Sequence, residues 1–332
     1  MTADLKLAFV TGGTGFVGGH LCNRLRETGF TVRALARRGS RRGALEALGC
    51  ELVEGDLSDE EALRRGAQGA SVVLHVAGLT KTARPDAFLE VNGEGTKNVL
   101  IAAQEAGFTG RFVLLSSLAA AGPARDEATP RTAADPLRPV SDYGRSKRLG
   151  EQYAEHARSA FPVTILRPGA IYGPGERDIY EMIKPVAKTG LSVEAGPPIR
   201  VQMTHVEDVV EALLVAAQRP EAANQTYFVN DTQAWTVAEI MDLVGEILER
   251  KVRHVRLPLA AGRGLAAVLD GVGKLRGKPV SPLTRDKMRE VAGGSWIADS
   301  TPFAQECGWR AKWALPDGLR QTLRWYRAEG WL

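Results

Sequence analysis

A glycine-rich turn between a predicted strand and a predicted helix constrains this sequence more than any other feature. Residues 6–11 (KLAFVT) form a short apolar run, and apolar side chains recur at helical spacing through residues 16–28. Between them lies TGGTGFVG, with glycines spaced GxxGxxG at Gly12, Gly15 and Gly18. Glycine suits a tight turn whose backbone approaches a pyrophosphate and whose helix packs close to the strand. Because the helix N-terminus also offers free N–H groups to an anion, the turn predicts a dinucleotide-binding site.

Apolar runs alternate with helical stretches through the first half of the chain. Four more strands are predicted, at residues 31–36, 71–77, 111–117 and 162–168. Residues 87–106, between two of them, are predicted to form one long helix. Continuous apolar strands that alternate with helices indicate an α/β fold with a Rossmann-type, doubly wound parallel sheet.

The rhythm changes after Pro174, which predicts a second, smaller region. We expect a Rossmann domain over residues 1–173 and a mostly helical substrate-binding region over residues 174–332, with parts of 204–230 returning to the main sheet. Residues 257–275 are predicted to form an amphipathic helix. The sequence leaves open whether this helix covers a pocket or touches a membrane surface.

Composition narrows the class of protein. Of the 332 residues, 44% are hydrophobic and 25% are charged, which is typical of a globular chain. A net charge of +4 does not by itself indicate nucleic-acid binding. The three cysteines lie far apart, and no cluster of His, Cys or carboxylate residues has the spacing of metal ligands. We therefore expect a cytoplasmic protein without a targeting segment, a membrane span or a bound metal.

A second motif, YGRSK at residues 143–147, follows SSLAAAG at residues 116–122. Tyr143 and Lys147 are four residues apart in a predicted helix and therefore share one face. Together with the GxxGxxG turn, these motifs resemble the extended and atypical members of the short-chain dehydrogenase/reductase superfamily, the NAD-dependent epimerases and dehydratases. The resemblance implies a catalytic set of Ser117, Tyr143 and Lys147.

Further matches extend the resemblance over nearly the whole chain. They are GDL (55–57), HVAG (75–78), VNGEGTKNVL (91–100), LRPGAIYGPG (166–175), THVEDVVEALL (204–214) and the C-terminal WALPDGLRQTLRWYRAEGWL. With the two arginines discussed below, the residues expected to bind the cofactor are Gly12, Thr14, Gly15, Phe16, Val17, Gly18, Arg37, Arg38, Asp56, Leu57, Ala77, Gly78, Asn92, Ser116, Tyr143, Lys147 and Pro168.

Other polar residues near these motifs have structural interpretations. Ser116 is interpreted chiefly as a strand-end hydrogen bonder, and Asn92 either contacts the cofactor or pins a neighbouring loop. Arg167 is predicted to be structural, and Asp208 to cap or brace its helix. The residues interpreted as satisfied histidines or packing tryptophans are His75, His205, Trp309, Trp313, Trp325 and Trp331.

The catalytic set suits hydride transfer between a nicotinamide and a carbonyl carbon. Negative charge grows on the carbonyl oxygen as the hydride arrives, and a free tyrosine has a pKa of about 10. The ammonium of Lys147 is expected to lower the pKa of Tyr143, which then exchanges a proton with that oxygen. Ser117 is expected to hydrogen-bond the same oxygen.

The end of the second predicted strand indicates which nicotinamide cofactor binds. An Asp or Glu about 20 residues past the glycine turn selects NAD. This sequence has Ala36, Arg37 and Arg38 there, and Ser40 follows. Guanidinium groups match the oxygens of a 2′-phosphate, so NADP(H) is predicted in preference to NAD(H). The alternative is that these arginines face solvent, as part of a basic run that ends at Arg42.

The resemblance also bears on the substrate. Many sugar-nucleotide enzymes carry Asn where this chain has Ala170, and Arg where it has Val201, with Arg200 one place away. Dehydratases use a Thr-Asp-Glu triplet where this chain has Ser117, Leu118 and Ala119. These departures favour the group that resembles 3β-hydroxysteroid dehydrogenase and dihydroflavonol reductase.

We therefore predict an NADP(H)-dependent oxidoreductase that interconverts a ketone and a secondary alcohol on a small-to-medium, lipophilic small molecule. The alternatives are a nucleotide-sugar epimerase or dehydratase and a non-catalytic NADP-binding redox sensor. The resemblance further implies a homodimer that pairs residues 87–106 and 142–159 of each subunit.

Overall fold

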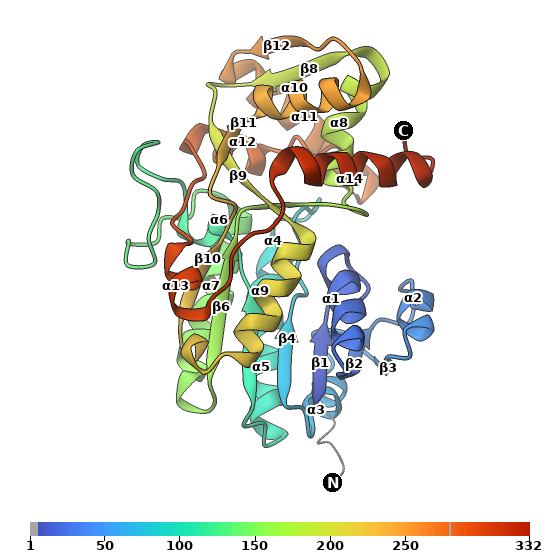
Figure 1. The fold of residues 1–332 in the computed structure, drawn as a ribbon, viewed down its shortest axis with the longest axis vertical. Coiled ribbons are helices and arrows are strands. Elements are labelled where there is room, and N and C mark those ends of the chain that lie inside the picture. The colour runs from blue at the N-terminus through green and yellow to red at the C-terminus, as the bar shows by residue number, and fades with distance from the viewer. Residues whose placement is uncertain (1–5, 279) are drawn as a thin grey trace.

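A seven-stranded parallel sheet forms the centre of the larger domain (Figure 1), in a computed structural model that describes residues 6–278 and 280–332. Residues 1–5, for which we expect no targeting role, and Pro279 lie outside the described part of the chain. The strands in sheet order are β10 (Thr226–Val229), β6 (Val163–Pro168), β5 (Arg111–Leu115), β4 (Val72–His75), β1 (Leu7–Thr11), β2 (Thr31–Ala36) and β3 (Glu51–Glu54).

This strand order confirms the predicted Rossmann-type fold. β1 pairs with β2 on one side and with β4 on the other, so that Val10 lies between Ala34 and Leu74. The chain therefore winds outward from β1 in both directions, and the point of reversal opens a crevice at the carboxyl ends of the strands. All five predicted strands of the first half are present, with slightly different ends for residues 71–77 and 111–117.

Helices cover both faces of this sheet. One face carries α1 (Phe16–Glu27), α9 (Val206–Gln218) and α13 (Thr301–Cys307), which bury Leu21, Leu213 and Phe303 against the strands. The other face carries α3 (Glu60–Ala67), α5 (Gly95–Glu105) and α7 (Asp142–His156). Short helices lie at the sheet edge and after β5, namely α2 (Gly43–Ala47) and α6 (Leu118–Ala121).

The predicted long helix at 87–106 is divided by a π-helical turn. It consists of α4 (Asp86–Phe88), a π turn over Leu89–Glu94, and α5. Close packing of α7 on the turn accounts for the glycines found there: a Cβ on Gly93 would lie 2.6 Å from the Leu149 side chain, and one on Gly150 would lie 2.5 Å from the Asn92 carbonyl oxygen. Such turns occur often at functional sites, and this one carries Asn92.

The smaller domain packs helices on two small sheets. The first sheet has the order β11 (Ala234–Thr236), β9 (Arg200–His205) and β7 (Ala170–Tyr172), and the second pairs β12 (Arg253–Leu257) with β8 (Leu191–Ala195). A separate core joins α8 (Asp178–Thr189), α10 (Val237–Leu248) and α14 (Leu315–Ala328). The remaining helices are α11 (Leu259–Arg276) and α12 (Arg285–Gly293), besides single 3₁₀ turns at 157–159 and 220–222.

Candidate active site

The glycine turn lies where β1 meets α1, and its backbone is packed too closely for side chains. Gly12 has a φ of +80°, and a Cβ there would lie 2.6 Å from the Ala77 nitrogen. A Cβ on Gly18 would lie 2.0 Å from the Gly12 carbonyl oxygen. α1 begins at Phe16, and its N-cap residue, Gly15, has no side chain that could bind the first N–H groups. The first turn of α1 contains no acidic residue. The N–H groups of that turn are therefore left for an anion, which fits the pyrophosphate of a dinucleotide.

Three predicted catalytic residues come together at the end of β5. Ser117 directly precedes α6, and its hydroxyl accepts a hydrogen bond of 3.1 Å from the Ala119 N–H. The Ser117 side chain lies close enough to the Tyr143 phenol to oppose the rise of its pKa. Lys147 lies one turn further along α7 and donates a hydrogen bond of 2.7 Å to the Leu115 carbonyl. A hydroxyl, a phenol and an ammonium thus surround one place at the carboxyl edge of the sheet.

Burial moves the pKa values of Tyr143 and Lys147 in opposite directions. It raises the pKa of Tyr143 to about 12, against the influence of Ser117, and the negative charge of Glu290 adds to the rise. The expected lowering of the Tyr143 pKa by Lys147 is therefore not found, because burial of the phenol outweighs it. It lowers the pKa of Lys147 to about 8, against the attraction of Glu151. Near neutral pH, Tyr143 is therefore a protonated acid, and Lys147 is a cation close to its titration point.

A buried ion pair joins the catalytic helix α7 to strand β6. Arg167 donates two hydrogen bonds of 2.8 Å to Glu151, and both side chains are at most 3% exposed. The Ser116 hydroxyl donates to the same carboxylate at 2.6 Å. The structural interpretation of Arg167 is therefore confirmed, and the Ser116 hydroxyl is directed at Glu151. Arg148, one turn before Glu151 on α7, lies 3.6 Å from the same carboxylate.

Asn92 connects the loop after β4 with the catalytic helix. Its amide oxygen accepts a hydrogen bond of 2.8 Å from the Leu79 N–H, and its nitrogen donates to the Leu79 carbonyl and the Ser146 hydroxyl at 3.0 Å. A Cβ on Gly78 would lie 3.0 Å from the Asn92 amide oxygen and 3.6 Å from the Lys147 ammonium nitrogen. Gly78, Asn92 and Lys147 thus form one wall of the predicted nicotinamide end.

The place expected for the adenosine half of the cofactor lies at the carboxyl ends of β2 and β3. The exposed side chain of Arg37 makes no ion pair within residues 6–278 and 280–332. Arg38, by contrast, forms an ion pair of 2.9 Å with Glu54, which also pairs with Arg42. Asp56 accepts hydrogen bonds from the Ser58 N–H and hydroxyl, and these lower its pKa. Within the described residues, Arg37, which directly follows β2, and Arg41 are therefore the exposed basic side chains without an ion pair at this end.

The other predicted cofactor-binding residues lie around these two ends. Thr14 is exposed in the glycine turn, and Phe16 packs edge-on against His20. The predicted residues that are half-buried or buried next to the turn or at strand ends are Val17, Leu57, Ala77 and Pro168.

The N-terminus of the catalytic helix is held by α12, which the sequence analysis did not identify. The Asp286 carboxylate accepts hydrogen bonds from the N–H groups of Asp142 and Tyr143, at 2.6 and 3.1 Å. Ser141 accepts from the Gly144 N–H and donates to Glu290, both at 2.9 Å. The residues of α12 are separated from their partners on α7 by more than 140 positions, and no local pattern in the sequence marks them.

His75, Asp208 and His205 differ in how completely their contacts fit a structural role. His75 is satisfied by the Thr11 and Thr96 hydroxyls, at 2.6 and 3.0 Å, as predicted. Asp208 braces the chain before α14 by accepting hydrogen bonds from the N–H groups of Lys312 and Trp313. His205 caps α9 through one ring nitrogen, but its other nitrogen is buried without a partner in the described residues, so it is not fully satisfied.

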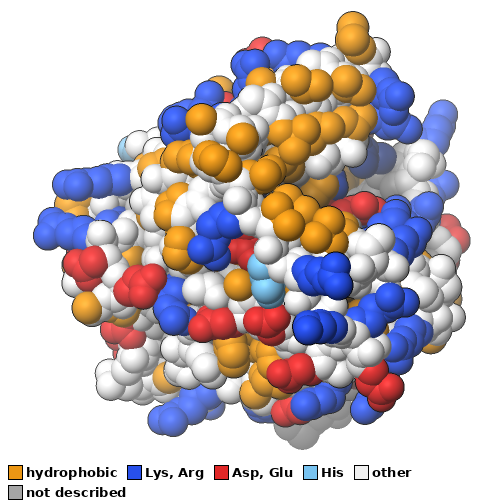
Figure 2. All heavy atoms as spheres, turned by 90° about the horizontal axis from the view of Figure 1, so that it is seen from above, with side chains coloured by type: hydrophobic (Ala, Val, Ile, Leu, Met, Phe, Trp, Pro, Cys, Tyr) orange, Lys and Arg blue, Asp and Glu red, His pale blue; other side chains and the backbone are white. Residues whose placement is uncertain are grey.

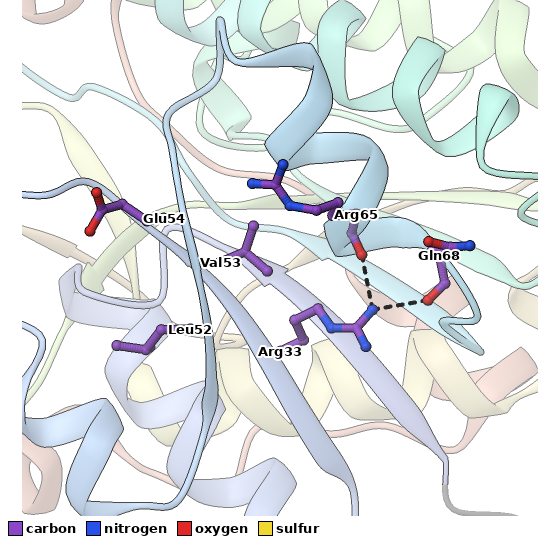
Figure 3. Close-up of a pocket in the computed structure, with 6 residues that line it drawn as sticks. All are labelled: Arg33, Leu52, Val53, Glu54, Arg65 and Gln68. Atoms are coloured by element: carbon purple, nitrogen blue, oxygen red, sulfur yellow. Dashed lines mark hydrogen bonds between the residues drawn. The ribbon is translucent and has the colours of Figure 1, made fainter.

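A surface hollow of about 420 Å³ lies away from the catalytic residues, between β2, β3 and α3 (Figure 3). Arg33 points from β2 toward the end of α3, where it donates hydrogen bonds of 3.0 and 2.9 Å to the carbonyls of Arg65 and Gln68. Leu52, Val53 and Glu54 supply the rest of the lining. The hollow therefore surrounds a structural arginine that caps the last turn of α3.

Comparison with known proteins agrees with this geometry. The profile of the NAD dependent epimerase/dehydratase family matches residues 8–230. The ceramide reductase of Caulobacter vibrioides is 35% identical over 100% of this chain and 98% of its own. The 4-hydroxy-2-methyl-3-oxo-4-farnesyl-3,4-dihydroquinoline-1-oxide ketoreductase of Stigmatella aurantiaca is 30% identical over 78% of each chain.

A solved structure shows the same fold. The UDP-glucose 4-epimerase of Thermus thermophilus, in complex with NAD, superposes with a TM-score of 0.77 over 97% of this chain and 99% of its own, at 22% identity. The chain therefore belongs to the NAD-dependent epimerase/dehydratase family, within the extended short-chain dehydrogenases/reductases, and is an NAD(P)-dependent oxidoreductase.

Proposed function

We propose that this protein reduces the ketone of a long-chain, lipophilic molecule to a secondary alcohol with NADPH. The observation that carries the proposal is the convergence of Ser117, Tyr143 and Lys147 at the end of β5. When bound, the nicotinamide supplies the hydride. Ser117 hydrogen-bonds the carbonyl oxygen, and Tyr143 donates its proton to that oxygen as negative charge develops. The positive charge of Lys147 stabilises the phenolate left on Tyr143.

The preference for NADPH rests on Arg37. It is exposed at the end of β2 and has no ion-pair partner in the described part of the chain, whereas Arg38 is bound to Glu54. No carboxylate stands at residues 36–38 to accept a ribose 2′-hydroxyl. A free guanidinium at this place favours a 2′-phosphate.

The substrate class rests on two observations. Arg200 is one residue before the position, Val201, at which sugar-nucleotide enzymes carry an arginine that binds the diphosphate. It forms ion pairs of 3.3 Å with Glu127 and Glu239. Ala170 offers no polar side chain at the position where those enzymes have Asn. In addition, the two relatives described above are named for ceramide and for a farnesyl-bearing ketone, both of which carry long hydrocarbon chains.

The test follows NADPH oxidation with a ceramide whose secondary alcohol has been oxidised to the ketone. We expect turnover with this ketone, which Tyr143→Phe reduces strongly, and none with UDP-glucose. The Ser159→Ala variant, altered at an exposed hydroxyl beyond α7, is the control and should retain wild-type turnover. Epimerisation of UDP-glucose without ketone reduction would support the epimerase alternative, and NADPH binding without any turnover would support the sensor alternative.

A further inference from the structure

Three of the large apolar side chains of helix α11 are exposed, whereas Leu259, Leu269 and Val272 are half-buried. Its buried residues are Gly262, Ala266 and Gly273, and Gly262 lies so close to Ala195 and Met288 that a Cβ would not fit. Val268 and Leu275 lie on the opposite side and are 64% and 91% exposed, and Leu265 lies at its flank and is 44% exposed. A helix of a globular domain normally turns its large apolar residues inward. This helix therefore presents an apolar stripe to its surroundings.

The neighbouring two-stranded sheet continues the apolar surface. Val193 on β8 and Val255 on β12 are directly paired, and they are 54% and 42% exposed. Leu191, two residues before Val193, points to the same side and is also exposed. Of the ten exposed large hydrophobic residues in the described part of the chain, eight lie between Met182 and Val280. Figure 2, viewed from the end of the smaller domain, shows hydrophobic side chains gathered there with Lys and Arg around them.

Basic residues surround this apolar surface. Residues 250–278 contain eight Lys or Arg and one Asp, a net charge of +7, whereas the whole chain has only +4. The rest of the chain is therefore net negative. Within the described residues, only Arg256 among these eight forms an ion pair, with Glu194 at 3.4 Å. The other seven, which are free to meet an external anion, are Arg250, Lys251, Arg253, Arg263, Lys274, Arg276 and Lys278.

We propose that this surface, formed by β8, β12 and α11 and called here the α11 face, binds the surface of a bilayer that contains anionic phospholipids. An exposed apolar patch of this kind marks an interaction site. Apolar side chains between basic ones match the boundary between acyl chains and negatively charged headgroups. No helix in the described residues is long and apolar enough to cross a membrane, so the contact lies in the plane of the bilayer surface.

The α11 face is connected to the catalytic residues through α12. α11 packs against α12, where Met288 lies beside Gly262. Asp286 and Glu290 of the same α12 bind the N-terminus of α7, next to Tyr143. A bilayer in contact with the α11 face would therefore be separated from the start of α7 by one helix, α12. Binding to the bilayer does not depend on the proposed ketone reduction.

The test is co-sedimentation of the full chain with two kinds of vesicle. One kind is made of phosphatidylcholine alone, and the other contains phosphatidylglycerol as well. We expect binding to the anionic vesicles that weakens as salt is added. Exchange of two basic residues in Lys274→Glu/Arg276→Glu should weaken this binding by about thirtyfold or more, since each basic side chain near an anionic surface contributes about 1 kcal/mol. Val268→Ser/Leu275→Ser should weaken it as well.

A matched control changes the same charge at the opposite end of the molecule. Arg64 and Arg65 on α3 are about half exposed, far from α11 in Figure 1, and Arg64→Glu/Arg65→Glu should bind vesicles like the wild type. Thermal unfolding of all variants verifies that they are folded. Absence of wild-type binding to anionic vesicles would overturn the proposal. An equal loss of vesicle binding in the control variant would also overturn it. A third contrary result would be a chain that does not bind vesicles but self-associates, with Val268→Ser/Leu275→Ser abolishing the self-association, since the face would then join two protein copies.

Discussion

Lys147 carries the pH dependence of the proposed reaction. Burial lowers its pKa to about 8, so the free enzyme loses this positive charge as the pH rises through that value. The positive charge of Lys147 favours the phenolate form of Tyr143. The pH dependence of kcat/KM reports the pKa values of groups in the free enzyme. We expect kcat/KM for the ketone to fall above about pH 8. Lys147→Arg, which keeps its charge to higher pH, should move the falling limb upward. A profile that is unchanged in this variant would remove Lys147 from the titration.

Arg37 carries the choice of cofactor. Arg37→Ala should raise the KM for NADPH by about tenfold or more, because a hydrogen bond to a charged group is worth roughly 1.5–3 kcal/mol. The KM for NADH should change little, since NADH lacks the 2′-phosphate. Arg38→Ala is the matched control: Arg38 is paired with Glu54, so its loss should have a smaller effect. Steady-state kinetics with both cofactors measure this, and equal losses with NADPH and NADH would contradict it.

The site residues that could be predicted are those whose motifs lie close together in the sequence. Ser117, Tyr143 and Lys147 could be singled out because strand, loop and helix follow one another within about 30 residues, and the family resemblance gave them roles. Asp286 and Glu290 were not predictable, because they reach Ser141 and Tyr143 from α12 only after the chain has folded. Their own segment shows an ordinary charged helix.

At the scale of elements, α12 stabilises the start of α7. The Asp286→Ala variant loses two hydrogen bonds to the N–H groups of that helix, and capping residues of this kind are worth about 0.5–2 kcal/mol. We expect the free energy of unfolding in urea to fall by about this amount, with a lower kcat because Tyr143 is less well positioned. Asp317→Ala, at the exposed first turn of α14, is the control and should cost less. An Asp286 variant as stable as this control would show that α12 does not hold α7.

Five strands of the sheet followed from the apolar runs, whereas β3 at the sheet edge and two further features of the fold did not. The π turn at Leu89–Glu94 has the composition of an ordinary helix, and it is explained by the contacts of Gly93 and Gly150 between separate helices. Strands β8 and β12 are short and half exposed, and their pairing joins residues about 60 positions apart. The α11 helix was predicted, whereas the outward direction of its apolar stripe depends on how it packs against Ala195 and Met288.

For the whole molecule we propose a homodimer through the helices that include residues 87–106 and 142–159. Leu89 and Ile101 on this surface are 45% and 44% exposed, as expected for an apolar interface. Light scattering at micromolar concentration should give twice the chain mass of 35.8 kDa. Ile101→Glu should shift the mass toward the monomer, and the same variant should leave binding to anionic vesicles detectable. A monomeric mass for the wild type would dispose of the dimer.

Hydride transfer to a ketone is the central claim, and an isotope tests it most directly. The protein is incubated with the ketone form of ceramide and NADPH that carries deuterium at the transferable position of the nicotinamide, and the lipid product is analysed by mass spectrometry. The wild type should yield a secondary alcohol with one deuterium on the former carbonyl carbon, and Tyr143→Phe should form it about two to four orders of magnitude more slowly. Product without deuterium, or equal rates in both proteins, would contradict the proposed reaction.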